Sequence, residues 1–98
     1  MAQIASTDMV YKKTVAPGPA DVSMKAYFIN GVTSADVFNP TKSAVVGVGN
    51  TLSSIWWCRA INVEDGTEGV VCTISSSIIT FSGIAADKNV CVLVAGTV

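Results

Sequence analysis

The side chains that could do chemistry in this sequence are its carboxylates, its serines and its three cysteines, because the chain contains no histidine. Histidine is the commonest general base and metal ligand, and the Ser-His-Asp and Cys-His arrangements both depend on it. The serines also have no lysine in an obvious activating context, so strand surfaces and turns explain them better than nucleophilic catalysis does. We therefore predict that the protein is not an enzyme.

The acidic residues cluster once, at Glu64, Asp65 and Glu68. Carboxylates on a loop could bind calcium or form the acid–base pair of a glycosidase, but calcium takes about six to eight oxygen ligands and the regular spacing of an EF-hand is missing. Gly47 and Gly49 lack the third glycine of a dinucleotide-binding motif and the Gly-Lys-Ser/Thr ending of a phosphate loop. The sequence therefore predicts a solvated turn, no metal and no cofactor.

The cysteines, Cys58, Cys72 and Cys91, are odd in number and have no CxxC spacing. This pattern favours reduced, buried thiols over a disulfide framework. The first residues contain neither the basic nor the apolar segment of a secretory signal. We expect a protein that folds in a cytoplasm.

The composition is poor in charge: 13% of the 98 residues are charged, where an average soluble domain has about 25%, and the mean hydropathy is +0.53. Exposed apolar patches on a small domain usually mark interfaces; the alternative is a monomeric sandwich covered by Ser, Thr, Asn and Gly. No apolar run approaches the roughly 18 residues of a membrane-spanning helix. At net charge −1, the six cations form no basic stripe. We predict binding to protein chains, and not to membrane or nucleic acid.

Good helix formers are scarce, so strands are the expected elements. Thr7 to Val15 is a first extended segment, and Ala16-Pro17-Gly18-Pro19 ends it because proline disrupts both helices and central strands. We predict an N-terminal arm and Pro-Gly linker at residues 1–20 and a single β domain at residues 21–98.

Alternation with period two predicts a core strand over Val22 to Ile29, whose apolar face carries Val22, Met24, Ala26 and Phe28. Val90 to Ala95 is apolar on both faces, which indicates a central or covered strand. Weaker signals predict a turn at Asn30-Gly31, a short edge strand at Asp36 to Phe38, a bulge or loop at Ser43 to Asn50, and a strand at Ser77 to Ser82. The fold class is all-β, a small antiparallel β-sandwich or barrel of about six to seven strands.

Ser54 to Ser75 contains two β-rich runs around Glu64-Asp65-Gly66, a hairpin signal that allows two registers. A two-residue turn places Arg59 opposite Cys72 and Trp57 opposite Ile74. A three-residue loop pairs three sets of apolar residues instead: Trp56 with Ile74, Cys58 with Cys72, and Ala60 with Val70. The second register is preferred, because a slip by one residue moves every side chain to the other face.

Trp56 and Trp57 are adjacent in a predicted strand, so their side chains should point to opposite faces of the sheet. The preferred register puts Trp56 on the apolar face and leaves Trp57 on the other, with Arg59 two residues on. Trp57 could be covered by its own chain, anchor a protein interface, or stack on a sugar.

The stretch "SSIWWCRAINVEDGTEGVVCTISSSIITFSGIAADKNVCVLVAG" resembles small virion proteins of tailed bacteriophages, in particular head decoration or cement proteins. The resemblance implies an all-β module that sits on the icosahedral shell between capsomers, often as a dimer or trimer, and stiffens the head. An immunoglobulin fold is not favoured, because Val70 stands where its tyrosine two residues before the cysteine would be.

These observations predict a non-enzymatic structural virion protein that is assembled in the host cytoplasm and binds the major capsid protein or another virion protein, as a homo-oligomer. The arm would clasp a neighbouring subunit by strand addition. The alternatives are a tail, neck or fibre component, or a carbohydrate-binding module with Trp57 and Tyr27 as stacking platforms. The predicted interface residues are Met9, Tyr11, Lys12, Lys13, Val15, Trp57 and Arg59.

Overall fold

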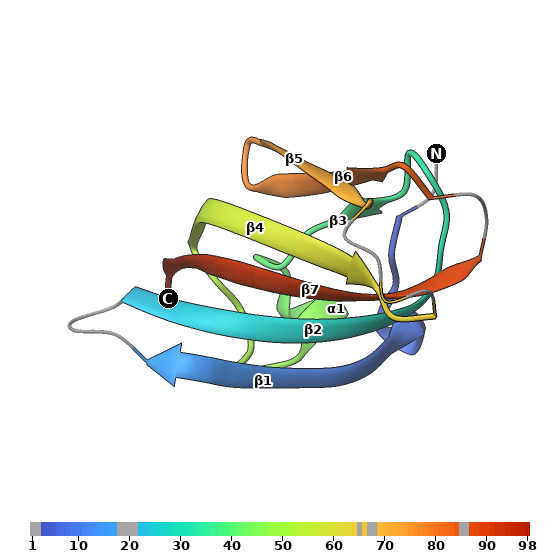
Figure 1. The fold of residues 1–98 in the computed structure, drawn as a ribbon. Helices are drawn as coiled ribbons and strands as arrows, with labels where there is room; N and C mark the ends of the chain where they lie inside the picture. The colour runs from blue at the N-terminus through green and yellow to red at the C-terminus, as the bar shows by residue number, and fades with distance from the viewer. Residues whose placement is uncertain (1–2, 18–21, 65, 67–68, 85–86) are drawn as a thin grey trace.

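The computed structural model describes residues 3–17, 22–64, 66, 69–84 and 87–98. In this part of the chain seven strands form two sheets (Figure 1). The larger sheet has the order β1-β2-β7-β4, with β1 at Met9–Pro17, β2 at Val22–Val32, β7 at Lys88–Thr97 and β4 at Ser54–Asn62. The smaller sheet has the order β3-β6-β5, with β3 at Val37–Phe38, β6 at Ile78–Ser82 and β5 at Val71–Ser75. The predicted all-β fold of antiparallel strands is confirmed.

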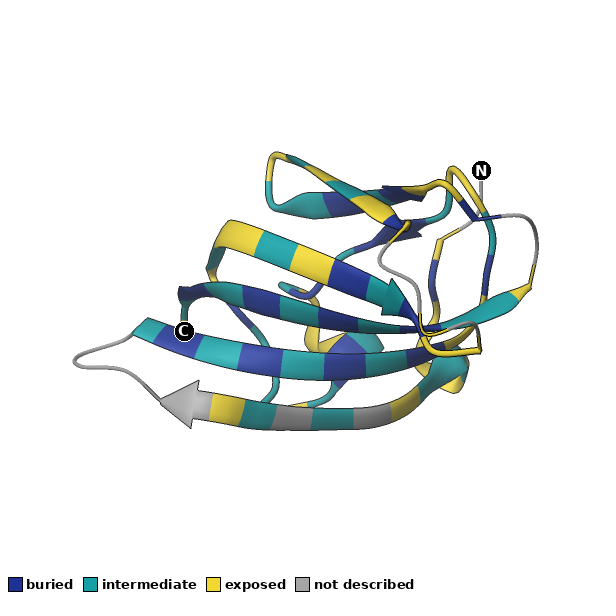
Figure 2. Cartoon of the chain, viewed as in Figure 1, coloured by how far each residue is buried: buried dark blue, intermediate teal, exposed yellow. Residues whose placement is uncertain are grey.

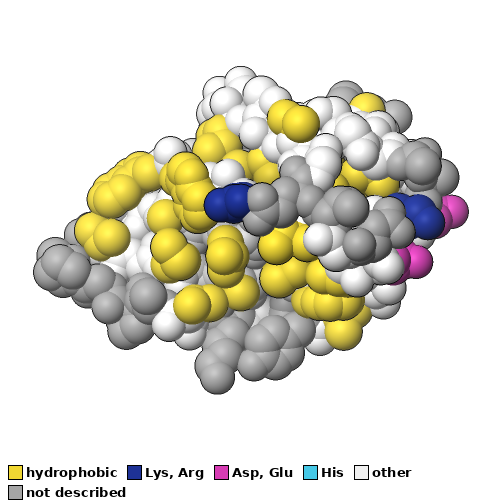
Figure 3. All heavy atoms as spheres, viewed as in Figure 1, with side chains coloured by type: hydrophobic (Ala, Val, Ile, Leu, Met, Phe, Trp, Pro, Cys, Tyr) yellow, Lys and Arg dark blue, Asp and Glu magenta, His cyan; other side chains and the backbone are white. Residues whose placement is uncertain are grey.

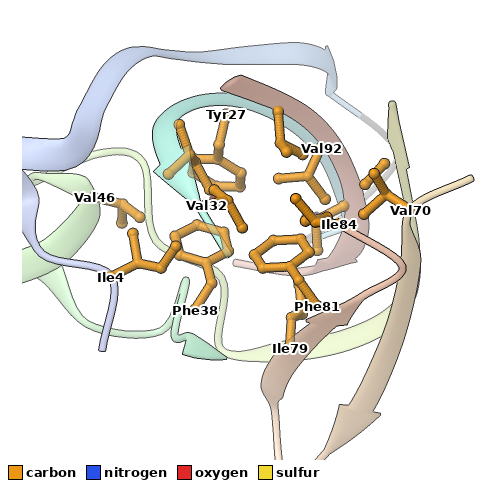
Figure 4. Close-up of a cluster of buried hydrophobic side chains, with 14 of the residues drawn as sticks. Ile4, Tyr27, Val32, Phe38, Val46, Val70, Ile79, Phe81, Ile84 and Val92 are labelled. Carbon is orange, nitrogen blue, oxygen red and sulfur yellow. The ribbon is translucent and has the colours of Figure 1, made fainter. Parts of the chain in front are cut away.

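The hydrophobic core lies between the two sheets (Figure 4). Its aromatic centre is Phe38, whose ring centroid lies 5.0 Å from that of Tyr27 and 6.4 Å from that of Phe81. The valines of β7 that face this core are fully buried, as are Ile29 and Ile79. Because these side chains come from both sheets, the core joins the two layers of the fold.

The remaining inner surface of the larger sheet is covered by the segment around the short helix α1 (Ser43–Val46). The Tyr27 hydroxyl donates to the backbone carbonyl of Asn50 at 2.7 Å. Lys25 is 3% exposed, and its ammonium donates to Thr14 Oγ1 at 2.7 Å and to the carbonyl of Gly49 at 3.4 Å. The polar ends of two buried side chains of β2 therefore have partners contributed by other segments.

The prediction for the face of β2 that enters the core was wrong. Ser23, Lys25, Tyr27 and Ile29 are buried, and the alternate apolar residues lie on the other side of the sheet, half-buried (Figure 2). The physical reason is that Tyr27 and Lys25 bury long apolar stems and place their polar ends against the α1 segment. The more hydrophobic face of this strand consequently points away from the core.

The strands predicted at Asp36 to Phe38, Ser77 to Ser82 and Val90 to Ala95 are present as β3, β6 and β7, and β7 is central as expected. The predicted turn at Asn30-Gly31 is instead an irregularity within β2, with a register shift before Val32 and a φ of 68° at Gly31. α1 and a turn occupy the segment where a bulge or loop was expected.

The predicted N-terminal arm does not extend from the domain. β1 pairs with β2 from Met9 opposite Ile29 to Pro17 opposite Ser23. The backbone N–H of Ile4 also donates to the carbonyl of Val37 at 2.9 Å, and the Ile4 side chain is buried. The segment is held because it completes one sheet and contacts the other. Residues 18–20 of the predicted linker lie outside the described part.

The predicted hairpin between β4 and β5 was also wrong, and both registers fail with it. β4 pairs with β7, β5 pairs with β6, and the two predicted partners belong to different sheets. Ser76 and Ser77, with φ of 51° and 62°, form the tight turn that joins β5 to β6. Asp65 and Glu68 of the predicted turn lie outside the described residues.

The pairing of β7 with β4 depends on a glycine. A Cβ atom built on Gly96 would lie 1.9 Å from the backbone oxygen of Ser54. We expect Gly96→Ala to push β4 away from β7 and to lower the free energy of unfolding by about 1–3 kcal/mol or more. Gly69→Ala is the matched control, because a Cβ there meets nothing within 4 Å. Urea denaturation of the two variants checks this, and equal stabilities would contradict it.

The buried phenol of Tyr27 predicts a loss of stability at alkaline pH. Burial raises the pKa of Tyr27 above its ordinary value of about 10. Its stabilising effect is therefore complete below pH of about 10 and is lost as pH rises above it, because the unfolded state releases the proton first. We expect Tyr27→Phe to lose about 1–2 kcal/mol at neutral pH, from the missing hydrogen bond, and to fall less steeply than the wild type above that pH. Parallel alkaline slopes in urea denaturation would contradict the assignment.

Candidate functional site: the outer face of the larger sheet

The surface with the most unusual chemistry is the side of the larger sheet that points away from the core. The pairings of β2, β7 and β4 align its residues in three rows across the sheet. We call this surface the outer face. Its first row is Phe28, Cys91 and Ile61, its second is Ala26, Leu93 and Arg59, and its third is Met24, Ala95 and Trp57.

The outer face is apolar but open. The smaller sheet and the α1 segment both pack on the opposite side of these strands (Figure 1). The view from the outer side shows hydrophobic side chains gathered over β4, β7 and β2 (Figure 3). In the same strands, the inward valines of β7 have no exposed surface, whereas the outward residues are half-buried or exposed. An apolar sheet face of this kind is typical of a surface that packs against another layer.

Two tryptophans stand at the end of the outer face nearest the start of β4. The register shifts between Ile55 and Trp57, so Trp56 lies in a β-bulge. Trp56 is 58% exposed and Trp57 44% exposed. The prediction that Trp56 lies on the core face was wrong, because the bulge removes the strict alternation on which it relied. Trp57 remains partly uncovered by its own chain.

The edges of the larger sheet are irregular. β1 carries register shifts between Met9 and Tyr11 and again between Thr14 and Ala16, and β4 carries the bulge at Trp56. Bulges bend an edge strand and interrupt its row of free hydrogen-bonding groups, so they oppose the addition of a further strand. The geometry favours the face of this sheet over its edges as a binding surface, against the predicted strand addition by the arm.

Arg59 is the one charged residue among the nine that define the outer face, and it already has an interaction within the chain. Burial raises the pKa of the Cys91 thiol, which keeps it neutral. Arg59 lies in the middle row on the edge strand β4, opposite Leu93. A surface that covers this face must therefore be mainly apolar.

The structure places the described members of the predicted interface at different points of the larger sheet. Trp57 and Arg59 belong to the outer face. Met9 packs against the core, Lys12 is half-buried, and Val15 is exposed on the edge strand β1. The side chains of Tyr11 and Lys13 lie outside the described part of the structure.

Sequence reasoning missed the contributions of β2 and β7 to this face, and that of Ile61 on β4. The available signal was that β7 is apolar on both sides, which requires a second covering layer or an open apolar face. The missed residues are Met24, Ala26, Phe28, Ile61, Cys91, Leu93 and Ala95.

Other kinds of site find little support in the described residues. No pocket opens among them, and no group of histidine, cysteine and carboxylate side chains is arranged to hold a metal ion. None of their helices is long and apolar enough to cross a membrane. Tyr27 is fully buried, so it cannot serve as the stacking platform predicted for a carbohydrate.

Comparison with protein-family models, curated proteins and solved structures finds no match for this chain.

The exposure of both tryptophans has a spectroscopic consequence. They are the only tryptophans in the sequence, so we expect the free protein to emit like solvent-exposed indole and to be quenched by acrylamide. Covering the outer face should shift the emission to the blue and reduce this quenching, mainly through Trp57. Fluorescence titration of Trp56→Phe and Trp57→Phe separates the two signals, and a blue emission maximum in the free monomer would be inconsistent with the exposed positions.

Proposed function

We propose that this chain is a non-enzymatic structural protein that works by packing its outer face against another protein chain. The observation that carries the proposal is the open apolar face on β2, β7 and β4. It lies on the far side of the same strands that build the core, so it is held rigidly and needs no rearrangement to bind.

The size of the outer face suits the centre of an interface. Three rows about 6.8 Å apart on three strands about 4.8 Å apart cover roughly 300 Å² in projection. The largest patch on a typical monomer is about 300–600 Å² and is often functional. A standard interface takes about 800 Å² from each partner, so the surrounding surface, including the exposed Trp56, supplies the rim.

The residues of the outer face bear on the choice among the possible partners. A symmetric dimer through the outer face would bury two Arg59 guanidinium groups, while none of the face residues is a carboxylate. A partner of different sequence does not bring a second guanidinium to this apolar surface. The resemblance of the sequence to phage head decoration proteins supports the shell protein of a tailed-phage head as that partner. Oligomerisation of this chain, which the resemblance also implies, would then use another surface.

The test is co-sedimentation of the full chain with empty phage head shells. Leu93→Lys places a charge in the centre of the outer face, and we expect it to weaken shell binding at least tenfold, a loss of about 1.4 kcal/mol or more. Val48→Lys is the matched control, because Val48 is an apolar residue that is 93% exposed and lies away from the face.

Three outcomes would argue against the proposal. Shell binding that Leu93→Lys leaves unchanged would exclude the outer face as the docking surface. A dimer in solution that Leu93→Lys dissociates would show that a second copy covers the face. Binding to purified tails and not to heads would support the alternative of a tail, neck or fibre component.

A further inference from the structure

Two of the three cysteines face each other between the sheets. Cys58 on β4 pairs with Val94 and shares the inward side of its strand with the buried Ala60. Cys72 on β5 pairs with the buried Phe81. β4 and β5 lie side by side at the boundary between the two sheets (Figure 1). Both cysteines are half-buried, and each thiol acts on the pKa of the other. They are not the directly opposed partners in one β-ladder that the preferred register predicted, but they lie on the inward sides of two neighbouring edge strands.

The position of these two strands allows them to approach each other closely enough for a disulfide bond. β4 is the edge strand of the larger sheet and β5 is the edge strand of the smaller one. A disulfide needs an S–S distance of about 2.05 Å and Cβ atoms about 3.5–4.5 Å apart. Since each strand is paired on one side only, the two can move together without breaking either ladder. Cys91 is excluded from this pair, because it lies on the opposite side of the larger sheet, opposite Ile61.

The thiol chemistry favours Cys58 as the attacking group. The hydrogen bond with Cys72 lowers the pKa of Cys58, because it stabilises the thiolate, and the pKa of Cys72 is raised by the same hydrogen bond and by burial. The thiolate is the reactive form of cysteine, and partial exposure lets a small oxidant reach it. Burial alone raises the pKa of Cys91, which makes this third thiol less reactive.

We propose that Cys58 and Cys72 form an oxidative modification site, at which a low-molecular-weight disulfide such as glutathione disulfide converts the two thiols into a bridge between the sheets. The Cys58 thiolate attacks one sulfur of glutathione disulfide, forms a mixed disulfide and releases one glutathione thiolate. The Cys72 thiolate, formed by loss of its proton to solvent, then attacks the Sγ of Cys58 and displaces the second glutathione. Two protein thiols are oxidised and one glutathione disulfide is reduced to two thiols.

The bridge has a structural consequence. The core contacts between the layers are non-covalent, and the new bond would join β4 of the larger sheet to β5 of the smaller one. Closing the loop between residues 58 and 72 restricts the unfolded chain, so the oxidised protein should unfold at a higher urea concentration. The outer face lies on the opposite side of β4, so this proposal stands independently of the proposed function.

The sequence makes the bridge easy to locate. Cleavage after lysine and arginine places Cys58, Cys72 and Cys91 in three separate peptides, at residues 43–59, 60–88 and 89–98. We expect the native protein treated with glutathione disulfide to lose the mass of two hydrogen atoms and to yield a linked pair of the first two peptides. Cys91→Ser should form the same bridge. Cys72→Ser should instead accumulate glutathione on Cys58, because the second thiol that resolves the mixed disulfide is absent.

Several results would overturn the assignment. One is a disulfide linkage that involves residues 89–98. Another is a wild-type protein that keeps a stable glutathione adduct on Cys58. The third is an oxidised protein in which neither Cys58 nor Cys72 is a free thiol and yet no bridge joins them. Because the wild-type peptide map is informative by itself, the test does not depend on the folding of any variant. Reduction with dithiothreitol should return both the original mass and the original urea midpoint.

Discussion

The orientation of β2 is the constraint on which the rest of this structure depends. Tyr27 and Lys25 turn inward because the segment after α1 offers backbone carbonyls to the phenol and the ammonium. Successive side chains of a strand point to opposite faces, so fixing these two residues inside sends Met24, Ala26 and Phe28 outside. Paired residues of neighbouring strands point to the same side of the sheet, so the orientation of β2 also sets that of β7, and β7 sets that of β4. The outer face is thus apolar because Lys25 and Tyr27 point to the opposite, buried side of the sheet.

The sequence is sufficient to predict the strands and insufficient to predict their partners. Alternation and turn residues are local signals, and they located β2, β6 and β7 closely. The pairing of β4 with β7 is not local, because it depends on the approach that Gly96 permits and on the tight turn at Ser76 and Ser77, which pairs β5 with β6 instead. A hairpin signal at Glu64-Asp65-Gly66 cannot compete with a longer apolar strand that needs a neighbour on each side.

The candidate site was predictable in part for the same reason. Trp57 and Arg59 were identified because an aromatic pair in one strand must present a side chain away from the core. The β2 residues were missed because the more hydrophobic side of a strand is normally the buried one, and Lys25 and Tyr27 reverse this only with the help of Gly49 and Asn50. No local pattern within Val22 to Ile29 predicts that Lys25 and Tyr27 have hydrogen-bond partners 24 and 23 residues further along the chain.

The low charge of the chain acquires a structural meaning from this arrangement. A two-layered fold with few charged residues must leave apolar surface somewhere, and here part of that surface forms one face of β2, β7 and β4 while the bulges of β1 and β4 interrupt the edges. Irregular edges limit open-ended strand pairing, which would lead to aggregation. The proposed partner, by covering the face, would add a third layer to β2, β7 and β4. Because such a partner binds only the folded chain, it also stabilises the fold by mass action, so that assembly and stability are linked through the same three strands.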